Sequence, residues 1–147
     1  MGDQSLKLIL PFRFQDSMFK RYFLHGLVAG ILAALAANIY DRIYFFATEA
    51  DFSGVLGISR IISLNIFFCF VAAFLNFFLV KWLKNTGEIV FNFLFSILSF
   101  AMIIIPISVS LPLDLKFPEL FPGLAVPMLF FPAISWYTVV PLFREKI

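Results

Sequence analysis

The stretch YFLHGLVAGILAALAANIY, from Tyr22 to Tyr40, contains no Lys, Arg, Asp or Glu. Three further stretches share this property: Ile61–Val80, Ile89–Leu113 and Leu120–Phe143. A helix needs about 20 apolar residues to cross a bilayer core about 30 Å thick, and all four stretches are close to that length. In lipid the backbone polar groups have no water to bind, so a crossing segment has to be helical. The sequence therefore predicts an all-α integral membrane protein with four spans, at about residues 22–46, 59–80, 88–111 and 120–143.

The overall composition agrees with this class. The chain is 62% hydrophobic and 14% charged, whereas soluble domains carry about a quarter charged residues. Nearly all of its 147 residues are used by the predicted spans and their connections. We therefore expect a four-helix transmembrane bundle with short loops over residues 21–147, and no separate soluble domain.

The first 20 residues form a leader of mixed character. Apolar residues such as Leu8 and Phe12 alternate with Lys7, Arg13 and Lys20. Such a segment can lie on a membrane surface, with its cations near anionic lipid. The alternative is a solvated leader with incidental apolar residues. We predict a cytoplasmic amphipathic leader over residues 1–20.

Lys and Arg are distributed unevenly among the predicted connections. Eight of the eleven lie in the leader, between the second and third spans, or at the C-terminus, and only Arg42, Arg60 and Lys116 lie elsewhere. Positive residues accumulate on the cytoplasmic side of membrane proteins. The distribution predicts that both termini are cytoplasmic. The outline resembles many small bacterial membrane families, without a motif that singles one out, so we expect a multi-pass protein of the bacterial inner membrane.

Small residues and asparagines are candidates for helix packing. Gly26, Gly30 and Ala34 follow one face of the first span, where small side chains let a neighbouring backbone approach closely. We favour a contact within the bundle over a contact with a second copy. Asn76 and Asn92, at similar depth in the second and third spans, are predicted to form a hydrogen-bonded pair.

Prolines predict irregular helices in the second half of the chain. Pro106 removes a backbone donor inside the third span, so a kink is expected there. Pro122, Pro127, Pro132 and Pro141 recur along the fourth span. We therefore expect the fourth helix to be distorted by proline.

A polar cluster is predicted where the first and second spans approach the outer face. Asn38 and Asp41 end the first span, and Arg60 and Asn65 begin the second. Two interpretations remain open. Asp41 and Arg60 form a structural ion pair at the rim, or the four residues line an outward-facing pocket for a polar or charged solute. We favour the ion pair.

The sequence predicts no metal, cofactor or nucleic-acid site. His25 is the single histidine and Cys69 the single cysteine, whereas haem or zinc ligation needs two or more such ligands. We expect His25 to face lipid headgroups. The basic residues are too few for a nucleic-acid surface.

The sequence contains no pairing of an acid, base or nucleophile that would predict an enzyme. We therefore expect a non-enzymatic subunit, scaffold or lipid-interacting accessory, with membrane lipid and either a second copy or another membrane protein as partners. The alternative is a binder or transporter of a small or lipid-like solute that uses the pocket near Asp41 and Arg60.

Overall fold

The computed structural model describes residues 3–111 and 116–143, except for the side chains of residues 3–17 and of Asn85. The described part of the chain is helical and contains no strand. Its α-helices are α1 (Asp3–Thr48), α2 (Ile58–Leu83), α3 (Gly87–Ala101), α4 (Ile104–Ser108) and α5 (Phe121–Phe143). Two short 3-10 helices, η1 (Lys84–Thr86) and η2 (Pro118–Leu120), lead directly into α3 and α5.

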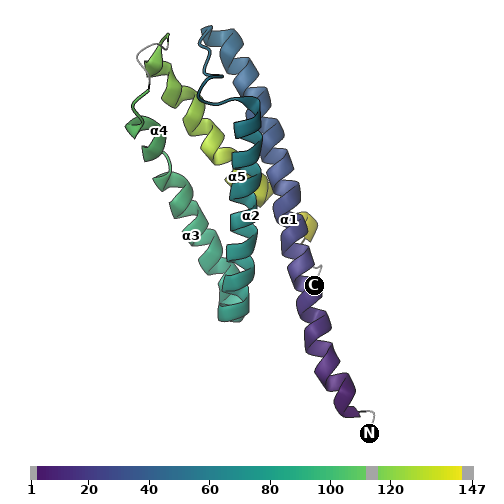
Figure 1. Ribbon diagram of the computed structural model, residues 1–147. Helices are drawn as coiled ribbons and strands as arrows, with labels where there is room; N and C mark the ends of the chain where they lie inside the picture. The colour runs from purple at the N-terminus through teal and green to yellow at the C-terminus, as the bar shows by residue number, and fades with distance from the viewer. Residues whose placement is uncertain (1–2, 112–115, 144–147) are drawn as a thin grey trace.

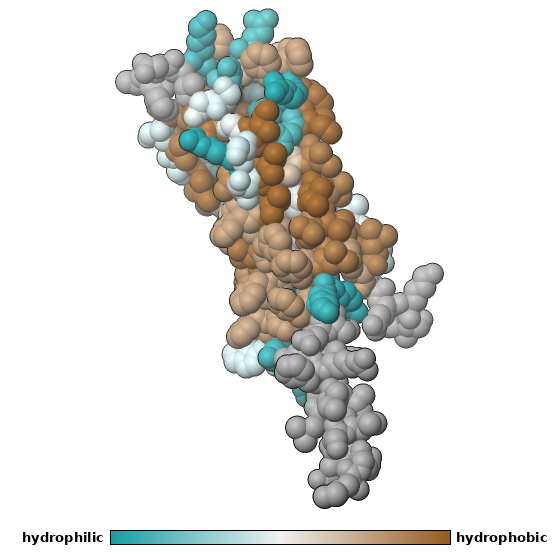
Figure 2. All heavy atoms as spheres, turned by 45° about the vertical axis from the view of Figure 1, so that its right-hand side comes forward, coloured by the Kyte–Doolittle hydropathy of each residue, from teal (hydrophilic) through white to brown (hydrophobic). Residues whose placement is uncertain are grey.

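Four helical segments are long and apolar enough to cross a membrane: Met18–Thr48, Ile58–Leu83, Gly87–Ser108 and Pro118–Phe143. Each overlaps one predicted span, and their ends differ from the predicted ends by a few residues. The surface is hydrophobic along the middle of the bundle, with hydrophilic residues gathered towards its ends (Figure 2). These features suggest a multi-pass membrane protein.

The four membrane-length segments run in alternating directions, with α3 and α4 pointing the same way as two parts of one segment (Figure 1). α1 packs against both α2 and α5, whereas α3 packs mainly on α2. We call the two ends of the bundle the Arg21 end, where α2 and α5 finish, and the Thr48 end, where α1 finishes. Phe52, in the connection between α1 and α2, is buried at the Thr48 end against the ring of Phe121.

The leader and the first span form one helix. We expected two elements, but α1 runs for 46 residues from Asp3 to Thr48, and its first part extends beyond the other helices (Figure 1). Pro11 is the only proline in this stretch, so little in the sequence interrupts the helix. The amphipathic surface position predicted for the leader concerns side chains that are not described, and it stays a prediction.

Small residues of α1 form the centre of the bundle. Ala29, Ala33 and Ala37 recur every fourth position and have no exposed surface. Ala29 and Ala33 belong to an apolar cluster with Cys69 and Trp136 nearer the Arg21 end. Ala37 belongs to a second cluster, with Phe52, nearer the Thr48 end. Because these side chains are only a methyl group, α2 and α5 can both approach the α1 backbone closely.

A break between α3 and α4 lies just before Pro106, which belongs to α4. A proline at this position cannot donate to the carbonyl of Met102, four residues earlier. That carbonyl accepts a bond from the N–H of Ile105 instead, at 3.1 Å. The helix therefore ends at Ala101 and begins again at Ile104, so the irregularity expected from Pro106 lies just before it.

Three prolines lie inside α5, which is nevertheless continuous from Phe121 to Phe143. They are Pro127, Pro132 and Pro141. The distortion that we expect from them stays a prediction.

Candidate functional site

The expected ion pair between Asp41 and Arg60 is not formed. Nη1 of Arg60 donates to the carbonyls of Val55 and Gly54, at 2.9 and 3.3 Å. Both carbonyls lie in the turn just before α2, so a side chain in the first turn of that helix reaches them without crossing to α1. Arg60 therefore anchors the connection between α1 and α2.

Asp41 and Asn38 lie on α1 without joining Arg60. Asp41 is half-buried, and the charged groups that act on it are Arg42 and Asp51. Hydrogen bonds from the side chain and the backbone N–H of Ser53 lower the pKa of the Asp51 carboxyl, which therefore stays ionised. Nδ2 of Asn38 donates to the carbonyl of Ala34 at 2.7 Å, within its own helix. Neither side chain is bonded to Arg60, and the pocket predicted from the four residues stays a prediction.

Asn65 lines a cavity, which we call the Asn65 cavity. Its volume is about 160 Å³, and its wall is almost wholly apolar. It lies between α2, α4 and α5, and its principal lining residues besides Asn65 are Ile61, Leu64, Phe68, Ile105, Pro106, Val109, Met128, Leu129 and Pro132.

The Asn65 cavity opens sideways onto the outer surface of the bundle. Three of its lining side chains, Leu64, Ile105 and Val109, are about half exposed, at 46%, 52% and 46%. These three side chains belong to α2 and to the α4 region, so the exposed side of the cavity lies between these two segments. A hydrocarbon ligand can therefore enter from the side of the bundle.

The Asn65 side chain has one bonded and one unbonded end. It is 5% exposed, and Nδ2 donates to the carbonyl of Ile61 at 2.8 Å. Its Oδ1 atom is buried and accepts no hydrogen bond. A buried acceptor without a partner costs about 1–3 kcal/mol, so a donor that reaches this oxygen would be stabilising.

His25 is buried in the bundle, so the expectation that it faces headgroups is wrong. Its ring lies parallel to the rings of Trp136 and Phe143, at centroid distances of 4.1 and 5.1 Å. Nε2 donates to the carbonyl of Trp136 at 3.1 Å. Only 4% of the residue is exposed. Two aromatic rings of α5 therefore hold this imidazole in a fixed orientation.

Polar residues from three helices surround a small cavity beside His25, which we call the His25 cavity. Its volume is about 40 Å³. Asn76 and Asn92 both line it but do not bond to each other, in contrast to the predicted pair. The Oδ1 atom of Asn76 is buried and unbonded. The remaining lining residues are Arg21, Tyr22, Glu88, Trp136, Val140 and Phe143.

The packing residues of α1 lie against α2. A Cβ atom on Gly26 would come within 2.7 Å of the Ala73 Cβ atom and 2.9 Å of the Cys69 carbonyl oxygen. A Cβ atom on Gly30 would lie 3.2 Å from Cα of Ile66. Ala34, one turn further on, is 5% exposed. The described contact of this stripe is within the bundle.

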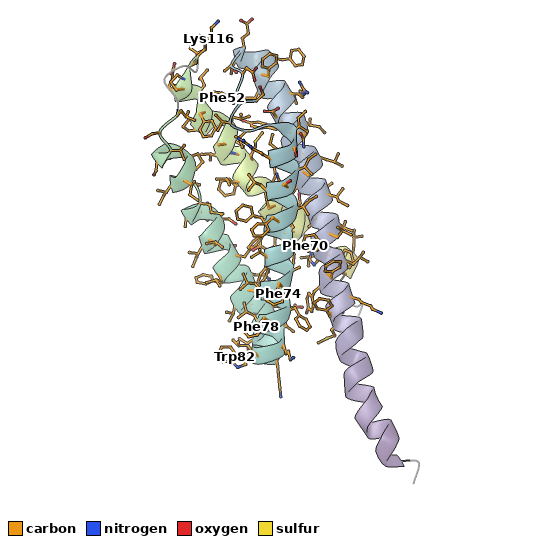
Figure 3. The ribbon with its side chains drawn as sticks, viewed as in Figure 1. Phe52, Phe70, Phe74, Phe78, Trp82 and Lys116 are labelled. Atoms are coloured by element: carbon orange, nitrogen blue, oxygen red, sulfur yellow. The ribbon has the colours of Figure 1, made fainter. Side chains whose placement is uncertain are left out.

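A third hollow, of about 340 Å³, lies on the surface between α1 and α2. Phe19, Phe70 and Phe74 line it, and Phe78 and Trp82 continue the aromatic series along α2 at four-residue spacing (Figure 3). Its wall is aromatic and aliphatic. It suits contact with hydrocarbon but offers little that would select one ligand.

Sequence reasoning missed Tyr22, Glu88 and Trp136 as members of a polar site. Tyr22 and Glu88 lie at the ends of predicted spans, a position typical of interfacial residues. In the structure the Tyr22 hydroxyl lies 3.4 Å from a carboxylate oxygen of Glu88. No local pattern links them to Trp136. Among the side chains described for residues 18–84, 86–111 and 116–143, no group of three His, Cys, Asp or Glu is placed to hold a metal ion.

No protein family model matches the sequence, and neither the curated proteins nor the solved structures include a significant match. The geometry of the two cavities is therefore the basis for a functional assignment. Of these, the Asn65 cavity is the larger and is open to the side of the bundle.

Proposed function

We propose that this chain is a non-enzymatic multi-pass protein of a bacterial inner membrane that binds a lipid-like ligand in the Asn65 cavity. Two observations carry the proposal: an apolar cavity of about 160 Å³, and the buried, unbonded Oδ1 atom of Asn65, one of the residues that line it. The ligand is expected to be a hydrocarbon chain that carries one hydroxyl or N–H group.

The size and chemistry of the cavity support this ligand class. An engineered apolar cavity of about 150 Å³ stays dry and binds benzene, so a cavity of this size accommodates a short length of hydrocarbon. Ligand pockets are typically apolar with a few polar groups that fix orientation. Here the unbonded polar atom is an acceptor, because one N–H of the Asn65 amide donates to Ile61 and the Oδ1 atom has no partner.

The position of the cavity suits a ligand that arrives from lipid. Asn65 lies seven residues into α2, or about 10 Å from its start at about 1.5 Å per residue. The distribution of Lys and Arg favours cytoplasmic termini, which would place this cavity in the outer half of the bilayer. A lateral opening lets a membrane amphiphile enter without crossing water.

The proposal is tested with two probes that differ by one hydrogen-bond donor. 1-Dodecanol can donate to Asn65, whereas its methyl ether cannot. The binding of each probe to the purified full chain in detergent is measured by native mass spectrometry. We expect the alcohol to bind roughly fivefold more tightly, because one net hydrogen bond is worth about 1 kcal/mol. Equal affinities would refute the proposal.

A pair of matched variants locates the effect. Asn65→Leu removes the acceptor and keeps a similar shape, so the preference for the alcohol should disappear. Asn38→Leu removes an amide on α1 that bonds within its own helix and does not line the cavity, so the preference should remain. Asn65→Leu should not lower the thermal stability of the ligand-free protein by much, since it also removes an unsatisfied buried oxygen.

A further inference from the structure

We propose that the His25 cavity binds a primary ammonium group next to a phosphate, as in the ethanolamine headgroup of a phospholipid. The cavity is formed where α1, α2, α3 and α5 converge at the Arg21 end. The proposal relies on the membrane location proposed above, but on neither the Asn65 cavity nor its ligand.

Three residues that line the His25 cavity carry groups that can accept a hydrogen bond. Asn76 is 6% exposed, and its Oδ1 atom has no partner. Because the Trp136 carbonyl can only accept, Nε2 of His25 carries the proton of their bond, and Nδ1 of the neutral ring keeps a lone pair. Glu88 adds a carboxylate whose bond from the Tyr22 hydroxyl is long, at 3.4 Å. Acceptors from three helices therefore converge on one small space.

Charge and aromatic rings favour a cation at this place. The Glu88 carboxylate attracts a cation, and Arg21, which lines the same cavity, attracts an anion, so the charges suit a ligand that carries both. Rings of Tyr22, Trp136 and Phe143 line the same cavity, and aromatic faces attract ammonium groups. The ligand group that fits is a cation with several N–H donors.

The volume distinguishes a primary ammonium from a methylated one. A water-sized group occupies about 10–15 Å³ by this measure, so a cavity of about 40 Å³ holds a –NH₃⁺ group and one or two waters. A trimethylammonium group is larger and has no N–H to donate. The cavity should therefore select ethanolamine over choline headgroups.

The cavity lies where a lipid headgroup would reach it. Glu88 is the second residue of α3 and Phe143 the last residue of α5, so the cavity is at the end of the bundle. Arg21 lines the same cavity, and a guanidinium is a favourable partner for the phosphate that adjoins the ammonium. Arg21 and Glu88 together match a zwitterionic headgroup.

The first experiment compares lipids that differ only in N-methylation. Dissociation constants for the full chain in detergent are measured by native mass spectrometry for ethanolamine, N-methyl, N,N-dimethyl and choline phospholipids with identical acyl chains. We expect affinity to fall along the series, by about tenfold or more in total, because hydrogen bonds to a charged group are lost. Equal affinities would overturn the proposal and leave a cavity that holds water only.

Variants assign the discrimination to this cavity. Asn76→Leu and Glu88→Gln should each lower the ratio of the choline-lipid dissociation constant to the ethanolamine-lipid dissociation constant towards one. Asn65→Leu should leave this ratio unchanged. Conversely, Asn76→Leu should keep the preference for dodecanol over its ether, so failure of one proposal is distinguishable from failure of the other. A full tenfold ratio in Asn76→Leu would contradict the assignment. The comparison of lipids on the unmodified chain still tests the proposal if a variant does not fold.

A competition experiment tests whether the ammonium group that binds belongs to a lipid or to a soluble amine. O-Phosphoethanolamine and O-phosphocholine are added to the chain loaded with the ethanolamine lipid. Displacement by the former but not the latter would support the ammonium site and show that a soluble amine enters it. Displacement by neither, with discrimination among the lipids intact, would support the lipid as the source.

Discussion

The hydroxyl of Tyr40 on α1 donates a 2.9 Å hydrogen bond to the carbonyl of Gly123 on α5. Gly123 lies four residues before Pro127, which has no N–H to offer this carbonyl. A neighbouring helix therefore supplies the donor that the proline removes, as helices in membranes require. Next to it, Tyr44 donates to the carbonyl of Leu120 at 2.7 Å. These two hydroxyls join α1 to the start of α5.

Tyr40→Phe should lower the free energy of unfolding by about 0.5–1.5 kcal/mol, the usual value of one net hydrogen bond. In a Pro127→Ala background the cost should shrink, because the N–H of the new alanine can serve Gly123. Tyr44→Phe is the control, since the Leu120 carbonyl does not depend on a proline and the cost should be the same in both backgrounds. Thermal or denaturant unfolding in detergent measures all four comparisons. An unchanged cost of Tyr40→Phe in the Pro127→Ala background would show that the proline is irrelevant to this bond.

Gly30→Leu should destabilise the bundle by about 1–3 kcal/mol, because it adds four carbons where α1 and α2 already touch. The Cβ atom alone would lie 3.3 Å from the Cβ atom of Cys69. Gly54→Leu is the matched control, since a Cβ atom there meets nothing within 4 Å. Melting temperatures in detergent give the comparison. Equal effects at the two positions would mean that the stripe of small residues is not a packing surface.

Removing Asp41 and Arg60 together should cost the sum of the two single changes. The two side chains share no bond, and Arg60 bonds to Val55 and Gly54 instead. The coupling energy in a double-mutant cycle with Asp41→Asn and Arg60→Gln should stay within about 0.3–0.5 kcal/mol of zero. A coupling energy near 1 kcal/mol would contradict this prediction and support the ion pair that was expected from the sequence.

Labelling of single cysteines in intact cells tests the orientation of the chain. Ser53, Lys84 and Lys116 are exposed, and the native Cys69 is fully buried, so a cysteine at each exposed position should dominate the reaction. The distribution of Lys and Arg predicts that Ser53→Cys and Lys116→Cys react from outside and Lys84→Cys only after permeabilisation. Reaction of Lys84→Cys in intact cells would invert the topology.

Much of the fold was predictable because it depends on local sequence. The length of each stretch without charged residues can be compared with the thickness of a bilayer, and this comparison identifies the segments long enough to span it. The break before Pro106 also follows from one residue, because a missing N–H disturbs the helix wherever it occurs. The small residues of α1 mark a packing face through their spacing alone. What the sequence could not show is which neighbouring helix uses that face.

The candidate sites depended on contacts between distant residues. His25 and Trp136 are 111 positions apart, and whether they stack depends on how α1 and α5 are rotated about their axes. The placement of α2 likewise leaves Oδ1 of Asn65 unbonded, while Arg60 bonds to Val55 and Gly54 and not to Asp41. By itself, the sequence determined four helices long and apolar enough to cross a membrane and the place where one of them breaks, because these follow from local chemistry. Only the tertiary structure decided which polar groups meet and which remain without a partner, because that depends on the rotation and depth of each helix relative to its neighbours.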